Sequence, residues 1–261
     1  MDEHRVTWGI VPAAGMGTRI QPLAFSKELL PVGSRRTESG DRPRAVSEYL
    51  LDRMVAAGAT RLCFVVAPSK TDIMSYYGGR FGPAAICYAV QATPNGLCDA
   101  LFTALPFLDS DDDVLVGLPD TLWFPPDGFR HLPNNAFTFL LFRVAHPELF
   151  DAVLTTEGGA VREVQVKQPQ PGSDWVWGAF RLSGAVLQEL YELWSRRGQS
   201  DQYVGTLVNA YLEAGGLVHA VKRGEVYVDV GTLHGYREAV NLCAGEPLAI
   251  AADDRPVAPG Y

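Results

Sequence analysis

Short apolar runs alternate with helical patterns in the first half of the chain, and this alternation limits the possible folds more than any other feature. Residues 7–12, 61–67 and 113–118 are each short and apolar, as strands buried on both faces are. Helices are predicted between them over residues 45–57 and 96–105. The alternation predicts an α/β fold with a mainly parallel sheet, flanking helices, and ligands beyond the carboxyl ends of the strands.

The remaining elements are less regularly ordered. Strands are predicted over residues 85–90, 137–143, 161–166, 175–182, 217–222 and 225–228, and helices over residues 70–77, 183–196, 202–214 and 232–244. Residues 246–261 contain three prolines and are expected to form an irregular tail. A chain of 261 residues can bury one substantial core, so we expect a single domain over residues 1–245.

Composition excludes several classes of function. The formal net charge is −8, whereas a nucleic-acid surface needs a basic face, so no nucleic-acid partner is expected. There is no apolar run of about 18 residues and no signal-peptide pattern, so we expect a cytoplasmic protein without a membrane partner. The four cysteines and five histidines lack metal-ligand spacing. A phosphorylated ligand must therefore meet positive charge that is concentrated locally.

Residues 11–32, VPAAGMGTRIQPLAFSKELLPV, place such charge directly after the first predicted strand. Small residues let backbone N–H groups approach an anion, and Arg19 and Lys27 can neutralise charge on a phosphate. The segment lacks the G-x-G-x-x-G spacing of a dinucleotide loop and the G-K-[ST] of a Walker loop. A phosphate cradle is therefore predicted, although either side chain alone could be an ordinary surface charge.

With these residues the chain resembles the sugar-phosphate nucleotidyltransferase family. The family signature, G-x-G-T-R followed by P-K-x-x-L-P-V, stands here as GMGTR and SKELLPV, with Ser26 in place of the proline. Four further segments follow in the family's order, QATPNGLCDAL, VGLPDTLWF, VREVQVKQP and YVDVGTLHGY, so the resemblance spans residues 7–244. The motifs look closest to bacterial UTP:glucose-1-phosphate uridylyltransferases, and the length is more like that of glucose-1-phosphate thymidylyltransferases.

The resemblance implies an enzyme that joins a nucleoside triphosphate to a sugar 1-phosphate, with Mg²⁺ as cofactor, and releases pyrophosphate. It implies a Rossmann-like sheet with a smaller sugar-binding lobe, a nucleotide-binding half at about residues 1–125, a sugar-phosphate half at about 126–245, and a homo-oligomer. The implied roles are catalytic for Arg19 and Lys27, nucleotide-binding for Ala13, Ala14, Gly15, Gly17, Thr18, Gln91 and Gly96, sugar-phosphate-binding for Lys167 and Gly178, and metal-binding for Asp120 and Asp229.

Chemistry alone also gives the two aspartates a role. Asp120 and Asp229 each follow a predicted strand, and Mg²⁺ typically takes one or two carboxylates together with phosphate oxygens. Taken singly, Asp229 could cap the following helix and Asp120 could belong to a turn. A sugar phosphate is largely dianionic at neutral pH, so catalysis would need no general base and would depend on positioning and electrostatics.

One departure from the family concerns the acceptor. Val166 stands directly before Lys167, where relatives have a glutamate, and Val166 cannot accept a hydrogen bond from a sugar hydroxyl. A deoxy or otherwise modified sugar, or even a small non-sugar phosphate, is therefore expected, unless Glu163 or Gln165 takes over the contact. A second departure is the charged stretch 34–45, which is longer than the family's usual link and is expected to form a mobile flap near the site.

Two other functions are alternatives. A catalytically idle sugar-nucleotide sensor could use the same fold, but intact Lys27, Asp120 and Asp229 argue against it. An NAD-dependent oxidoreductase would need the dinucleotide glycine spacing that is missing here. The sequence leaves the nucleobase, the sugar and the oligomeric state open.

Overall fold

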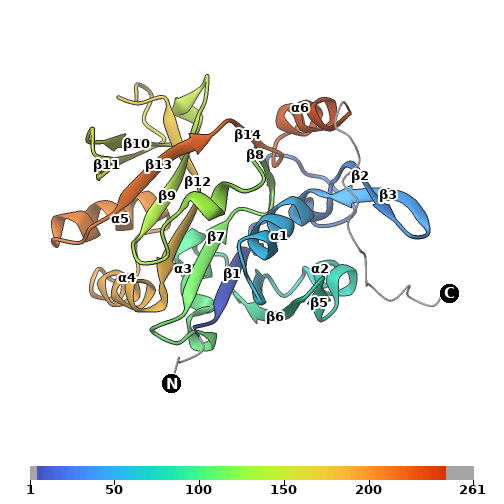
Figure 1. Ribbon diagram of the computed structural model, residues 1–261, viewed down its shortest axis with the longest axis horizontal. Helices are drawn as coiled ribbons and strands as arrows, with labels where there is room; N and C mark the ends of the chain where they lie inside the picture. Colours follow the sequence, from blue (N-terminus) through green and yellow to red (C-terminus); the bar gives the residue numbers. More distant parts are fainter. Residues whose placement is uncertain (1–4, 245–261) are drawn as a thin grey trace.

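The computed structural model describes residues 5–244 and is built around a mixed sheet of ten strands (Figure 1). Its members are β1 (Thr7–Pro12), β4 (Arg61–Val66), β5 (Arg80–Phe81), β6 (Ala84–Val90), β7 (Asp113–Gly117), β9 (Thr138–Arg143), β10 (Asp151–Thr155), β11 (Val161–Val166), β12 (Trp175–Ser183) and β13 (His219–Gly224). The strands β7, β1, β4 and β6 run parallel to one another, and antiparallel strands extend the sheet beyond β7.

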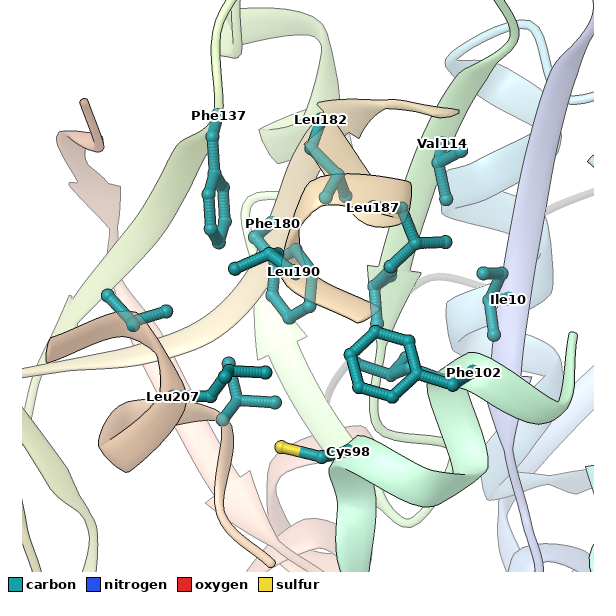
Figure 2. Close-up of a cluster of buried hydrophobic side chains, with 14 of the residues drawn as sticks. Ile10, Cys98, Phe102, Val114, Phe137, Phe180, Leu182, Leu187, Leu190 and Leu207 are labelled. Carbon is teal, nitrogen blue, oxygen red and sulfur yellow. The ribbon is translucent and has the colours of Figure 1, made fainter. Parts of the chain in front are cut away.

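Helices cover both faces of this sheet. The helices are α1 (Val46–Ala56), α2 (Thr71–Tyr77), α3 (Gly96–Thr103), α4 (Gly184–Arg196), α5 (Val204–Glu213) and α6 (Leu233–Cys243). Successive side chains of a strand point to opposite faces, so Ile10 packs in the core beneath α3, α4 and α5, while its neighbour Val11 packs with α1 and α2. Figure 2 shows the first of these cores, with Phe102 of α3 beside Leu187 and Leu190 of α4.

Two small antiparallel ribbons lie outside the main sheet. One joins β8 (Thr121–Phe124) to β14 (Val226–Asp229), and α6 packs beside it. The other is a hairpin of β2 (Pro31–Thr37) and β3 (Gly40–Ala45), which projects at the opposite side of the view from β10 and β11 (Figure 1). Among residues 5–244, no helix has both the length and the apolar composition that a membrane crossing requires.

The predicted α/β fold with a mixed, mainly parallel sheet is confirmed, and the predicted strands and helices are present with ends that move by a few residues at most. The stretch 34–45 forms most of the β2–β3 hairpin, and its expected role as a mobile flap near the site stays a prediction. Strands β8 and β10 were not predicted. The expected tail at 246–261 lies outside the described residues, and the division into two functional halves stays a prediction.

Buried ion pairs explain why so charged a hairpin folds. Glu48 on α1 is fully buried and accepts hydrogen bonds from Arg42 (2.9 and 3.0 Å) and from the Tyr76 hydroxyl (2.6 Å). Arg35 on β2 lies 2.9 Å from Glu48 and also pairs with Asp52. Three arginines of the hairpin, Arg35, Arg42 and Arg44, therefore pair with acidic residues of α1, and helix and hairpin neutralise each other's charge.

Candidate active site

The two aspartates expected to bind metal lie side by side at the carboxyl end of the parallel strands. Asp120 follows β7 and directly precedes β8, whereas Asp229 is the last residue of β14. The β8–β14 ribbon pairs Asp229 with Thr121, and the Val230 N–H donates to the Asp120 carbonyl at 2.9 Å. Backbone pairing thus brings together two carboxylates that are far apart in sequence.

Gly231 borders the space between these carboxylates. A Cβ atom at Gly231 would lie 2.9 Å from Oδ2 of Asp120 and 2.9 Å from Oδ1 of Asp229. Both carboxylates therefore adjoin one small region that only a glycine leaves free. Two hard oxygen donors fit a Mg²⁺ ion that takes its other ligands from phosphate and water. No cluster of three or more His, Cys, Asp or Glu side chains that could hold a metal occurs within residues 5–244.

Each carboxylate is paired with a cation from the Gly-rich segment. Lys27, at the start of a short 3-10 helix (Lys27–Leu29), forms an ion pair with Asp120, and Nη1 of Arg19 lies 2.7 Å from Oδ2 of Asp229. Gly17 has φ +64°, and a Cβ there would lie 2.7 Å from Cδ of Lys27, so this glycine lets the lysine chain pass. The structure thus brings Arg19, Lys27, Asp120 and Asp229 into one cluster.

Both members of the buried pair are held in their charged forms. Burial by itself lowers the pKa of Lys27, but the Asp120, Glu28 and Asp229 carboxylates outweigh it, so the pKa of Lys27 is raised. Burial likewise opposes ionisation of Asp120, yet Lys27 and the more distant Arg19 lower its pKa. Lys27 and Asp120 therefore form a compact pair of opposite charges, which suits binding and transfer of phosphates.

A cavity of about 330 Å³ opens beside the carboxylates. Lys167 lines it with φ +45°, and its Nζ lies 4.9 Å from the centroid of the Tyr203 ring. The Lys167 N–H donates to the Phe150 carbonyl, which fixes the turn after β11. The cavity is lined by Arg19, Gly96, Leu97, Leu118, Asp120, Thr121, Leu149, Phe150, Asp151, Lys167, Trp177, Gln202, Tyr203, Val204, Tyr227 and Asp229.

The loop residues expected to bind nucleotide are only partly directed at this cavity. The Ala13 N–H donates to the Val65 carbonyl at 2.7 Å and so is already used within the sheet. Gly15 and Thr18 are exposed, and Ala14 lines a second hollow of about 430 Å³ together with Lys27. The nucleotide-binding roles predicted for these loop residues stay predictions. Lys27 lines the second hollow and also pairs with Asp120, so it lies between this hollow and the carboxylates.

Gln91 and Gly178 also lie away from the main cavity. Gln91 is buried, and its Nε2 donates to Asp99 Oδ2 at 2.6 Å and to the Gly96 carbonyl at 3.2 Å. It lines a separate hollow of about 390 Å³. A Cβ at Gly178 would lie 2.4 Å from the ring of Tyr227, so Gly178 supports a cavity wall and does not itself line the cavity.

Sequence reasoning missed several lining residues, among them Asp151, Phe150 and Tyr227. Asp151 begins β10, a strand of five residues that directly follows a 3-10 turn and gave no clear alternation. Tyr227 lies in YVDVGT, two positions before Asp229, and the period-two rule could have placed it on the same strand face.

Comparisons with known proteins identify the family to which this chain belongs. The sequence model of the family described as "Nucleotidyl transferase" matches residues 8–245. A glucose-1-phosphate thymidylyltransferase of Neisseria meningitidis is 30% identical over 247 residues, covering 90% of this chain and 81% of the relative. A UTP–glucose-1-phosphate uridylyltransferase of Haloferax volcanii is 25% identical over 228 residues, covering 85% of this chain and 90% of the relative.

A solved structure of UTP-bound UGPase from Acinetobacter baumannii has the same fold, with a TM-score of 0.73 at 21% identity, covering 91% of this chain and 93% of that one. The motif resemblance, the match to the family model and the curated relatives all agree. The chain belongs to the nucleotidyl transferase family, among its sugar-phosphate nucleotidyltransferases.

Proposed function

We propose that this enzyme transfers a nucleotidyl group from UTP or dTTP to a glucose-1-phosphate-type acceptor and releases pyrophosphate. The observation that carries the proposal is the cluster in which Arg19 and Lys27 meet Asp120 and Asp229 at the rim of a cavity that also contains Lys167. The names of the relatives, glucose-1-phosphate thymidylyltransferase and uridylyltransferase, support the choice of donor and acceptor.

The residues divide the work between the two substrates. Asp120 and Asp229 would hold Mg²⁺, which when bound supplies positive charge to phosphate oxygens. Lys27 and Arg19 would exchange their carboxylate partners for oxygens of the triphosphate, where negative charge grows as pyrophosphate leaves. Lys167 would orient the acceptor phosphate in the cavity. The acceptor is already an anion, so the chain needs to supply position and charge and no base.

The alternative of an idle sugar-nucleotide sensor has no observation in its favour, because the cluster that turnover requires is intact. A cytoplasmic location and self-association stay predictions of the sequence. The nucleobase and the sugar are the parts of the proposal that experiment must decide.

The test is pyrophosphate release from a panel of nucleoside triphosphates combined with a panel of sugar 1-phosphates. We expect release only when Mg²⁺, a triphosphate and a sugar 1-phosphate are all present, with uracil or thymine preferred. Omitting the sugar phosphate is the control, because a simple triphosphatase would still release product. Absence of release with every pair, although the protein binds sugar nucleotides, would instead establish the sensor.

A further inference from the structure

Asp151 contributes an unsatisfied carboxyl group to the wall of the cavity. It is the first residue of β10 and lines the cavity beside Lys167 and Trp177. Its Oδ1 is buried without a hydrogen-bond partner among residues 5–244. Its Oδ2 accepts one long hydrogen bond, 3.4 Å, from Nε1 of Trp177.

This arrangement costs stability unless a ligand uses it. An ionised carboxyl group offers about four acceptor positions, and a buried one that is not fully hydrogen-bonded loses the hydration it had in water. Burial raises the pKa of Asp151, consistent with that loss, while Trp177 and Lys167 partly oppose the effect. The terminal torsion of an aspartate is broad, so a small rotation can turn either oxygen toward a ligand.

The neighbouring strand offers no competing acceptor. Asp151 lies directly opposite Val166 in the β10–β11 register. Val164 and Val166 face α5, since their methyl groups lie 2.7 Å from the position a Cβ would take at Gly205. Glu163 and Gln165 alternate with these valines and so project from the other face of β11.

Gln165 is also occupied elsewhere. Its Oε1 accepts from the Gly172 N–H at 2.7 Å, and its Nε2 donates to Glu163 at 3.3 Å. Neither Glu163 nor Gln165 lines the cavity. Among the described residues that line it, Asp151 is the carboxylate besides Asp120 and Asp229.

We propose that Asp151 is a specificity-determining residue whose carboxylate accepts a hydrogen bond from a ring hydroxyl of the acceptor sugar. This inference rests on the proposed function. It reverses the expectation that Val166 makes the site favour a deoxy sugar, because the adjacent strand supplies the acceptor atom that Val166 lacks. Lys167 lines the same cavity and already supplies a positive charge that partly opposes the effect of burial on the pKa of Asp151, so a neutral hydroxyl fits better than a second cation such as an ammonium group.

The experiment compares kcat/KM for the best hexose 1-phosphate of the panel with kcat/KM for its monodeoxy analogues and its amino analogue. The wild-type protein should discriminate against at least one deoxy analogue by roughly 10- to 100-fold, as expected for a hydrogen bond to a charged group. Asp151→Ala should abolish that discrimination. Asp151→Asn keeps the shape of the side chain and one acceptor oxygen, so it should retain a smaller ratio. This variant also tests the role if Asp151→Ala fails to fold. Glu163→Gln, on the other face of the adjacent strand, is the matched control and should keep the wild-type ratio.

Several results would overturn this role. One is that the wild-type protein has the same kcat/KM for every deoxy analogue as for the parent hexose 1-phosphate. Another is that the ratio of parent to deoxy kcat/KM is unchanged in Asp151→Ala and Asp151→Asn. A third is that this ratio is lost in Glu163→Gln. If the wild-type protein preferred the amino analogue and this preference depended on Asp151, the group that Asp151 binds would be an ammonium group and not a hydroxyl. Release of pyrophosphate with unaltered ratios defeats this inference alone, whereas no release with any acceptor defeats the proposed function and this inference together.

Discussion

The ammonium group of Lys27 is held by one partner in the structure, and the proposed function requires it to bind another. In the described structure its ammonium group is bound to Asp120 and largely buried, which keeps the side chain in position. If Lys27 acts as proposed, the same group would leave that carboxylate during turnover, at least in part, to meet a triphosphate. A lysine is suited to this exchange, because its compact charge and three freely rotating donors need no fixed partner geometry.

Replacing Lys27 by Met should therefore lower kcat by roughly 100- to 1,000-fold while KM for the triphosphate changes little, since the charge that Lys27 meets grows in the transition state. Steady-state kinetics of pyrophosphate release would measure both constants. Lys222→Met, which removes a lysine that packs over Trp175, is the control and should behave as wild type. If Lys27→Met raised KM and left kcat unchanged, Lys27 would be a binding contact only.

Most secondary-structure elements with long apolar patterns could be predicted, whereas the short strands β8 and β10 and the hairpin held by charge could not. The strands β1, β4 and β7 are buried on both faces, so their composition alone identifies them. The strand β3 reads GDRPRA, which gives no strand signal, because it is held by ion pairs of Arg42 and Arg44 with Glu48 and Asp52 of the following helix and has no alternating apolar side chains.

The same distinction applies to the site. Asp120 and Asp229 stand in recognisable motifs at strand ends, so their proximity could be expected from the family resemblance, although the antiparallel β8–β14 ribbon is what brings them together. Asp151 could not be found in this way, because its place in the cavity depends on the register of β10 against β11 and β12. That register is set by packing and not by a motif.

At the β2–β3 hairpin we expect Glu48→Gln to lower the free energy of unfolding by about 3–5 kcal/mol, because Arg35 and Arg42 would lose a buried charged partner. Urea unfolding would measure the loss. Asp41→Asn is the matched control, since its ion pair with Arg36 is exposed and should contribute at most about 1 kcal/mol. Equal effects of the two changes would mean that the ion pairs to α1 are not what stabilises the hairpin.

On the scale of the whole molecule, the main cavity lies where residues from the two halves of the chain meet. Arg19 and Asp120 come from the first half of the chain, and Lys167 and Asp229 come from the second. The sheet is continuous between these parts through the pairing of β12 with β7. A ligand in the cavity therefore contacts elements throughout the sheet, and its binding should stabilise the fold as a unit.

Saturating triphosphate with Mg²⁺, at about 100 times Kd, should raise Tm by about 5–10 °C, which corresponds to about 2.7 kcal/mol in a protein of this size. Thermal unfolding with and without a chelator would measure the part that depends on metal. Asp120→Asn and Asp229→Asn should lose that part, whereas Asp174→Asn, which alters an exposed pair with Arg143, should retain it. A shift that chelation leaves undiminished in the wild-type protein would contradict the metal assignment.

The β8–β14 ribbon also determines when during synthesis the enzyme can begin to work. A ribosome makes the Gly-rich segment and Asp120 early, but β8 has no partner strand in the ribbon, and Arg19 no aspartate at position 229, until almost the whole described chain exists. A polypeptide that terminates anywhere before β14 therefore lacks the pair of carboxylates altogether. Premature termination should yield inert chains with an open ribbon edge, never a partly active enzyme.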